Sequence, residues 1–460
     1  MLDPEVHSVL SLESVGSALG CTHWHRRGRP IVRHTGGRFA AGVGLLACLA
    51  AAMGAASSAG ASPAAQGGRN HRVDRVVSAV EALHLPGAVI GVTGGATGNF
   101  ERAFGDARPG RAMALDDHFR IGSITKTFTA TVVLELVDRH LLSLSDRLAA
   151  WEPLVPNARR ITVAMLLDMR SGIWDEGGTG PGGRESLLSA WVSQHCRGHD
   201  PACGKRVWTP QEIVNLAIRQ GAAYPPGTWY YSDTNYVILG IIAQDVTHQP
   251  FGRLLRGLVL DPLHLRQTSF PTSSLAIPRP ATVGYVPDAS GRYQPADVLN
   301  PSATFGYGNM ISTLHDLQMW ARDLAEGALL TPRTRRIRDQ LMLTGVADYP
   351  LAGTGTTTGL VVRYGLGLID LSNLVGHNGF ISPDGYSAEM WSLPNGRGTI
   401  VELFNSLALC DNVEYLADAV NTSLAQAAFG SDLYRVASPE ISCPDAAVVP
   451  GHAVTTPVRG

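Results

Sequence analysis

Apolar residues recur along the first part of the chain with two different spacings. Residues 73–85 follow the period of an amphipathic helix, while residues 88–93 and 100–104 are short apolar runs of the kind that form strands. A glycine-rich stretch, residues 94–98, separates the two runs. We therefore predict a helix followed by an antiparallel hairpin.

A second helical pattern begins near residue 123. Residues 119–122 have an extended pattern, and residues 125–140 then place apolar side chains on one helical face. Further helical patterns, broken by glycine and proline, follow at residues 163–169, 185–193, 210–218, 234–246, 252–258 and 312–343. The chain closes with β-like runs at residues 365–371, 386–393 and 399–405 and a last helix at residues 413–428.

Predicted strands thus come from both ends of the chain, with a helical block between them. This order predicts an α/β (α+β) fold in which helices flank an antiparallel sheet and a mostly helical subdomain is inserted. We assign residues 71–150 and 291–430 to the α/β domain and residues 151–290 to the inserted subdomain. Residues 431–460 form a C-terminal tail, and a cleft between the two subdomains is the expected site.

Composition supports this picture and excludes some partners. The chain has 460 residues, of which 45% are hydrophobic and 17% charged, which is enough for two packed subdomains. Its formal net charge is −2, so nothing indicates a nucleic-acid partner.

Residues 1–70 resemble a targeting segment and linker rather than part of the fold. Five arginines between residues 26 and 38 precede a small apolar run at residues 39–56, and Ala59-Gly60-Ala61 fits a cleavage site. This order predicts a secreted or cell-envelope protein. A disordered arm with a membrane anchor is an alternative. Lipidation at Cys48 is another, although the apolar run continues past that cysteine.

Four cysteines remain if the first segment is removed. An even number in an oxidising compartment predicts two disulfides, and proximity favours Cys196–Cys203 and Cys410–Cys443. His195, His199 and Asp200 lie near the first pair, so a metal cluster is an alternative. The spacing matches no common zinc motif, and we predict no metal and no other cofactor.

One tetrapeptide carries the first chemical signal. The chain has only two lysines, and one of them lies in Ser123-Ile124-Thr125-Lys126. Ser-x-x-Lys is the signature of serine acyl-transferases that activate the nucleophile with lysine. Positions i and i+3 share a helix face, so the two side chains can meet, and the helix dipole favours an alkoxide at its N-terminus. Alternatively, Ser123 only caps the helix and Lys126 is solvated.

Two further segments complete a set of three motifs. Tyr231-Ser232-Asp233 and His377-Asn378-Gly379 follow Ser123-x-x-Lys126 in order along the chain. Together they resemble the serine β-lactamase-like family, which includes class C β-lactamases, D-alanyl-D-alanine carboxypeptidases and related esterases. The resemblance extends to connecting blocks such as Ser171-Gly172 and covers roughly residues 72–430.

The resemblance implies a role for each catalytic residue. Ser123 attacks a carbonyl and forms an acyl-enzyme, with Lys126 and Tyr231 as the base, and Tyr231 passes a proton to the leaving group. A phenol suits this task only if neighbouring cations lower its pKa, and Lys126 and His377 are the candidates. Tyr231 could instead be a core aromatic, and His377 could merely fill a strand.

The resemblance also implies how the substrate is held. The backbone N–H groups of Ser123 and Phe380 form the oxyanion hole. His377, Asn378 and Gly379 lie on an edge strand facing the substrate, where Gly379 allows close backbone approach.

The motifs depart from the family pattern at three positions. Asp233 stands where the family most often has asparagine, His377 replaces the lysine of β-lactamases, and Asn378 replaces threonine or serine. A carboxylate cannot donate to a substrate carbonyl, and a neutral imidazole is a poor carboxylate anchor. Asp233 could pair with Lys126, bind a cationic substrate group, or cap the helix at residue 234. Reading Ser232-Asp233-Thr234 as a class-A-like motif ignores Tyr231.

We therefore predict a secreted serine hydrolase that works through an acyl-enzyme. D-alanyl-D-alanine carboxypeptidase-like activity is the first hypothesis, followed by an esterase and then a β-lactamase. The partner is a peptide, ester or β-lactam small molecule, with association to the cell envelope, and we expect a monomer. A non-catalytic cell-wall or penicillin-binding sensor is the rival; Asp233 is its best support, and the presence of Ser123, Lys126 and Tyr231 argues against it.

Overall fold

The computed structural model describes residues 70–94, 98–177, 203–288, 290–296, 299–340, 362–371, 373–381, 384–407 and 413–430. The predicted targeting segment, the predicted helix at residues 185–193 and the C-terminal tail lie outside these residues. So do Cys196, Cys410 and Cys443, and the side chain of Cys203 is not described either. Both disulfides therefore stay predictions.

An eight-stranded antiparallel sheet forms the larger layer of the fold, in the order β3-β2-β1-β12-β11-β10-β9-β8. Its strands are β1 (Gly87–Gly94), β2 (Phe100–Arg108), β3 (Arg111–Ala112), β8 (Val362–Tyr364), β9 (Ile369–Leu371), β10 (Leu374–Ile381), β11 (Tyr386–Ser392) and β12 (Gly398–Phe404). The pairing of β1 with β12 joins the N-terminal and C-terminal parts of the fold, from Ala88 opposite Phe404 to Gly94 opposite Gly398. The predicted fold class is thereby confirmed.

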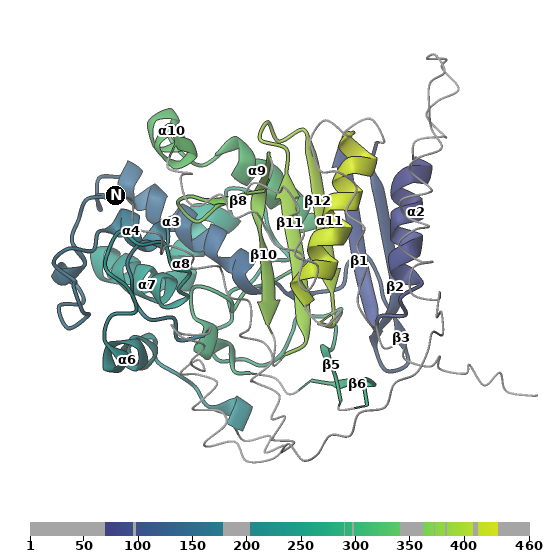
Figure 1. The fold of residues 1–460 in the computed structure, drawn as a ribbon, viewed down its shortest axis with the longest axis horizontal. Coiled ribbons are helices and arrows are strands. Elements are labelled where there is room, and N and C mark those ends of the chain that lie inside the picture. Colours follow the sequence, from purple (N-terminus) through teal and green to yellow (C-terminus); the bar gives the residue numbers. More distant parts are fainter. Residues whose placement is uncertain are drawn as a thin grey trace, which may run out of the picture.

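Helices cover both faces of this sheet (Figure 1). Helices α2 (Asn70–Glu81) and α11 (Val413–Phe429) pack on one face, over a core that includes Ile90, Trp391 and Phe404. Helices α3 (Thr125–Asp138) and α9 (Leu314–Glu326) cover the other. Alternate side chains of β1, β11 and β12 supply each core, as the two-residue period of a strand requires.

The helical block lies beside the sheet and consists of α4 (Val163–Leu167), α6 (Pro210–Gln220), α7 (Thr234–Thr247) and α8 (Phe251–Leu255) with the π turn Arg256–Leu260 (Figure 1). Helix α3 is buried between this block and the sheet: Leu134 and Leu136 are 1% exposed. Phe128 of α3 stacks on Trp320 of α9 with ring centroids 4.4 Å apart. The same helix that carries Lys126 is thus fixed from two sides.

Two short β pairings and one further helix also belong to the described fold. Strand β4 (Phe119–Arg120) pairs with β7 (Ile311–Ser312), and β5 (Tyr285–Pro287) pairs with β6 (Tyr293–Pro295). Helix α10 is Pro332–Gln340. No helix in the described residues is long and apolar enough to cross a membrane.

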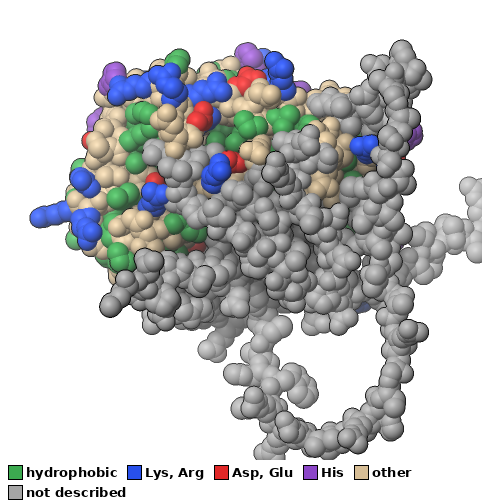
Figure 2. All heavy atoms as spheres, turned by 45° about the horizontal axis from the view of Figure 1, so that its top comes forward, with side chains coloured by type: hydrophobic (Ala, Val, Ile, Leu, Met, Phe, Trp, Pro, Cys, Tyr) green, Lys and Arg blue, Asp and Glu red, His purple; other side chains and the backbone are tan. Residues whose placement is uncertain are grey.

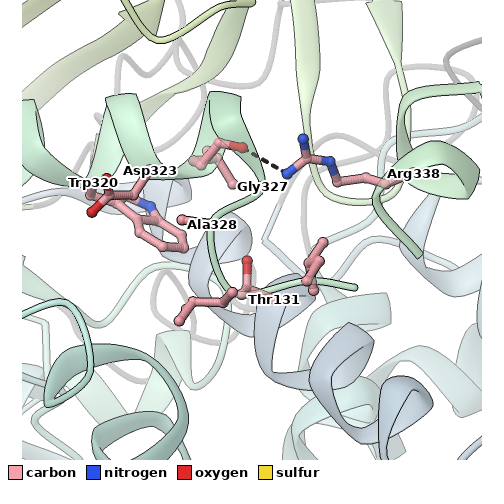
Figure 3. A pocket seen from close by; sticks show the side chains of 9 residues that line it. Thr131, Trp320, Asp323, Gly327, Ala328 and Arg338 are labelled. Carbon is pink, nitrogen blue, oxygen red and sulfur yellow. Dashed lines mark hydrogen bonds between the residues drawn. The ribbon is translucent and has the colours of Figure 1, made fainter. Parts of the chain in front are cut away.

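A small pocket lies between α3, α9 and α10 (Figure 3). Its wall includes Thr131, Trp320 and Arg338, and the Arg338 guanidinium donates a hydrogen bond of 2.7 Å to the Leu324 carbonyl. Because Arg338 is only 3% exposed and binds the last turn of α9, its contacts are those of a helix cap. None of the three sequence motifs contributes to this wall.

The structure departs from the sequence prediction where glycines interrupt an apolar run. The predicted strand at residues 365–371 is a turn followed by β9, and Gly367 adopts φ +75° within it. A Cβ at Gly367 would lie 2.2 Å from the Ala130 Cβ, so the turn approaches α3 closely. The predicted helix at residues 312–343 is likewise two helices, because Gly327 ends α9 in the left-handed conformation.

Candidate active site

A tight turn presents the candidate nucleophile. The 3₁₀ turn Gly122–Ile124 carries Ser123 and leads directly into α3, as the sequence predicted. Lys126, in the first turn of α3, is 0% exposed, and its Nζ donates a hydrogen bond of 2.7 Å to Ser123 Oγ. The two side chains of the Ser-x-x-Lys motif therefore meet, and Lys126 is not a solvated residue.

Strand β10 runs along this turn and brings two backbone amides together. A Cβ at Gly379 would lie 2.1 Å from the Ile121 carbonyl oxygen and 2.8 Å from Ser123 N. A Cβ at Gly122 would lie 2.7 Å from Phe380 N. Only glycine fits at either position, so the backbone at Gly379–Phe380 lies directly against the Gly122–Ser123 turn. This close approach is what an oxyanion hole formed by the amides of Ser123 and Phe380 would need, and that hole stays a prediction.

Strand β10 is not an edge strand, contrary to the sequence prediction. Strands β9 and β8 lie beyond it in the sheet. However, β9 pairs only with Leu374–Gly376, so the half of β10 that contains His377 and Gly379 is left to face the nucleophile turn. Because β9 is so short, this half of β10 is open toward the nucleophile turn, as it would be in an edge strand.

Gly379→Ala is expected to lower the rate of Ser123 acylation by about 10²–10³-fold, which is the loss caused by removing one oxyanion donor. The added methyl group would force the Ser123 amide away from Phe380 N. Acylation of the purified variant by a fluorescent β-lactam measures this effect. Gly257→Ala is the control, because nothing lies within 4 Å of a Cβ there. An acylation rate within twofold of the parent would rule out this oxyanion hole.

Tyr231 lies over the Ser-x-x-Lys pair. Its ring centroid is 4.8 Å from Lys126 Nζ, and its phenol is hydrogen-bonded to the Ser123 side chain. Burial, together with the nearby Asp233, raises the pKa of Tyr231 well above its usual value. The expectation that neighbouring cations lower this pKa is therefore wrong, and the phenol keeps its proton in the resting site. Its contacts are with the nucleophile, which a purely structural core aromatic would not need.

Asp233 pairs with the lysine. Its Oδ1 lies 2.6 Å from Lys126 Nζ. Asp233 occupies the N-cap position of α7, yet its backbone is helical and its side chain makes no capping hydrogen bond. Burial lowers the pKa of Lys126 while Asp233 opposes that shift. Of the alternatives for Asp233, the structure supports ion pairing rather than capping.

Neighbouring Ser232 points elsewhere. Its side chain is fully buried and donates a 3.4 Å hydrogen bond to the Trp174 carbonyl. The alternative class-A-like reading, which begins at Ser232, is therefore not supported, and Tyr231-x-Asp233 is the arrangement that reaches the nucleophile.

His377 is buried and neutral. It is 1% exposed, and its Nδ1 lies 2.5 Å from the Asn378 carbonyl oxygen. A carbonyl can only accept, so Nδ1 carries the proton and Nε2 accepts from the Tyr364 hydroxyl at 3.3 Å. Burial, and secondarily Lys126, lowers the pKa of His377 to about 3. His377 thus supplies no positive charge to Tyr231 or to a substrate, which corrects the prediction.

Asn378 lies on the other side of the strand. His377 is opposite Met390 and Asn378 is opposite Glu389 in the pairing of β10 with β11. Successive residues of a strand face opposite sides, so the Asn378 side chain is directed toward the α2 and α11 face. Of the third motif, Gly379 therefore approaches the nucleophile turn directly, together with the backbone of Phe380, while His377 contacts Tyr231 and Tyr364.

Two buried acids and a tyrosine escaped the sequence analysis. Asp175 is 5% exposed, and its Oδ1 accepts hydrogen bonds from Asp233 N at 3.0 Å and Gly177 N at 3.2 Å. Glu176 is 0% exposed beside it. The adjacent acids follow the Ser171-Gly172 block, and that proximity was the available signal. Tyr364, which contacts His377, begins the run Tyr364-Gly365-Leu366-Gly367, which resembles one of the family's connecting blocks, but the sequence analysis assigned no role to its side chain.

Comparison with known proteins agrees with this arrangement. A family model described as Beta-lactamase matches residues 73–421. The chain belongs to the Beta-lactamase family. That match spans nearly the whole region for which the sequence alone indicated a resemblance, and the family's helix-flanked antiparallel fold is the one observed.

Individual members of the Beta-lactamase family are only moderately similar. The putative penicillin-binding protein PbpX of Bacillus subtilis is 26% identical over 216 residues, 47% of this chain and 48% of PbpX. D-alanyl-D-alanine-carboxypeptidase/endopeptidase AmpH of Escherichia coli is 24% identical over 293 residues, 62% of this chain and 69% of AmpH. The chain thus matches about half the length of PbpX.

A solved structure is similar over a longer stretch. The D-stereospecific amidohydrolase from a Streptomyces species is 28% identical, with a TM-score of 0.62. The match covers 78% of this chain and 98% of the amidohydrolase. The proteins similar to this chain therefore include one named as an amidohydrolase and one named as a carboxypeptidase/endopeptidase.

Proposed function

We propose that this protein is a serine hydrolase that cleaves D-alanyl peptide bonds through an acyl-enzyme, in the manner of a D-alanyl-D-alanine carboxypeptidase. The observation that carries the proposal is the 2.7 Å contact between Ser123 Oγ and the fully buried Lys126 Nζ. Burial lowers the pKa of Lys126, which suits a base. The names of AmpH and of the Streptomyces amidohydrolase support amide substrates with a D-configured residue.

The geometry supports a sequence of steps in which each proton that is removed is passed on to another group. Neutral Lys126 takes the Ser123 hydroxyl proton while Oγ bonds to the substrate carbonyl carbon. The carbonyl oxygen becomes an oxyanion between the amides of Ser123 and Phe380. The carbon–nitrogen bond then breaks, Tyr231 gives its proton to the departing amine, and Lys126 returns a proton to Tyr231. Water enters in the amine's place and releases the acyl group by the same steps in reverse order.

Export by residues 1–70 forms part of this proposal, because peptides that end in D-alanine belong to the cell envelope. Intact-mass measurement after addition of a D-Ala-D-Ala peptide, a β-lactam and a short acyl ester tests the substrate class. We expect release of free D-alanine and a transient mass increase on Ser123. Turnover of the ester alone, with no acylation by the peptide, would replace the peptidase proposal by an esterase.

A second candidate is an amidase for substrates that carry a free amino group. The specific observation is the Asp233 carboxylate, which is 14% exposed, contacts Lys126 and stands at the position where the family has an amide. A carboxylate accepts from an ammonium group and repels a carbonyl oxygen. Because Lys126 takes up Oδ1, the other oxygen, Oδ2, is the one that would accept from the free amine of an amino-acid amide, an interaction that an N-acylated peptide lacks.

Asp233→Asn is expected to raise acylation by amide-bearing β-lactams relative to short esters by about tenfold, because a hydrogen bond worth ~1–2 kcal/mol replaces a repulsive contact. The ratio of the two acylation rates is the measurement. Asp245→Asn, at the exposed end of the same helix α7, is the control. An unchanged ratio in the Asp233 variant would show that this carboxylate acts only on Lys126.

A further inference from the structure

Two segments beside the nucleophile are held together by buried hydrogen bonds. Residues 174–177 follow α4, and residues 232–234 lead into α7. The Thr234 hydroxyl donates to the Trp174 carbonyl at 2.9 Å and accepts from Glu176 N at 3.2 Å. The Asp175 carboxylate accepts from the Asp233 backbone at 3.0 Å. The position of Asp233 therefore depends on the loop that carries Asp175.

These contacts place three carboxyl groups near Lys126. If all three were ionised, their negative charge would exceed what the one ammonium group can neutralise. Asp233, Asp175 and Glu176 are the three carboxyl groups that act on it. Within the part of the chain that the structure describes, the other titratable groups near Lys126 are phenols, whose pKa values burial raises, and one neutral imidazole: Tyr231, Tyr236, Tyr307 and His377. Asp233 is in direct contact with the ammonium, so the two remaining acids are the groups that must hold protons.

The two remaining acids differ in how they can ionise. Burial, followed by repulsion from Asp233, raises the pKa of Asp175 to about 8 and that of Glu176 well above its usual value. Asp175 also accepts two backbone hydrogen bonds, from Asp233 and Gly177, which favour its charged form. Asp175 is thus the acid whose charge changes within the range where the enzyme would operate.

We propose that Asp175 is a positioning residue that holds Asp233 against Lys126 and whose own ionisation controls how readily Lys126 gives up its proton. The inference rests on the proposed function, since it assumes that neutral Lys126 activates Ser123. As pH rises, a negative charge on Asp175 stabilises the ammonium form of Lys126 and delays the appearance of the base. Removal of that charge therefore moves the acidic limb of the rate profile to lower pH.

Two variants separate the charge of Asp175 from its hydrogen bonds. Asp175→Asn keeps an oxygen that accepts from Asp233 N and Gly177 N but cannot ionise. Asp175→Ala loses both the charge and the acceptor. Asp168→Asn is the control: Asp168 lies on the same stretch of chain, is 7% exposed with a pKa raised by burial to about 6, and contacts Arg170 rather than Lys126.

The measurement is the rate at which a fluorescent fluorophosphonate labels the full-length protein between pH 5.5 and pH 10. We compare the labelling rate at pH 8.5 with the rate on the alkaline plateau. This ratio is expected to be about threefold or more higher in Asp175→Asn than in the parent, because a nearby charge has been removed. In Asp175→Ala, the same shift is expected together with a plateau at least about tenfold lower, since Asp233 loses its backbone anchor. Asp168→Asn should follow the parent profile.

The outcomes distinguish this inference from the proposed function. If Ser123 is labelled and the Asp175→Asn profile coincides with that of the parent, the role of Asp175 is refuted while the hydrolase proposal stands. An equal shift in Asp168→Asn would also refute it, because the effect would then belong to any buried acid. If the parent is not labelled at Ser123 at any pH, both proposals fail.

Discussion

Replacing Ser123 by alanine is expected to abolish covalent labelling and to lower turnover by about 10⁴-fold or more, as deletion of a nucleophile does in other serine hydrolases. The reason is chemical, because no other hydroxyl shares the position of Ser123 Oγ, hydrogen-bonded to both Lys126 and Tyr231. Labelling by a fluorescent fluorophosphonate and release of D-alanine measure the two effects. Ser123 is half-buried in the turn that precedes α3, so the variant should fold normally.

Ser290→Ala is the matched control for this variant. Ser290 is an exposed serine whose hydroxyl bonds to Asp288 and Arg292. That control should label and turn over like the parent. Stoichiometric labelling that persists in Ser123→Ala would assign the nucleophile elsewhere and overturn the acyl-enzyme proposal.

Local periodicity was sufficient to predict the main elements of the fold. The apolar runs at residues 386–393 and 399–405 correspond to β11 and β12, and the pattern at residues 210–218 corresponds to α6, whose start is fixed by a capping box at Thr209 and Glu212. The turn that replaces the first half of the predicted strand at residues 365–371 could not be foreseen. It exists because Gly367 packs on Ala130, a contact across more than 200 residues.

The same distinction between local and distant contacts applies to the site. The Ser123–Lys126 contact follows from a spacing of three residues on one helix, and the sequence predicted it. The charge states of Tyr231 and His377 do not follow from any spacing, because burial by distant segments sets them. The role of Asp175 depends in the same way on two loops that meet only in the folded chain.

Lys126→Ala and Tyr231→Phe are each expected to lower the acylation rate by about 10³-fold, within the range that general acid–base catalysis contributes. The double variant should be little worse than either single variant. Lys126 Nζ lies 4.8 Å from the Tyr231 ring centroid, and both side chains bond to the Ser123 hydroxyl. Because the proton moves through the two groups as one unit, loss of either group stops the transfer.

The measurement is a double-mutant cycle on the rate of acylation by a fluorescent β-lactam, with thermal unfolding to confirm that each variant folds. Tyr236→Phe is the matched control, because its ring also faces Lys126, at 5.9 Å, while its hydroxyl donates to the Leu167 carbonyl instead of contacting Ser123. That control should retain acylation to within about threefold, because it loses only neutral hydrogen bonds, to the Leu167 carbonyl and, at 3.5 Å, to the Tyr364 hydroxyl. If the losses in Lys126→Ala and Tyr231→Phe add in the logarithm of the rate, the two groups act independently and the shared proton path is wrong. Tyr231 would then act only on the leaving group, with Lys126 as the sole base for Ser123.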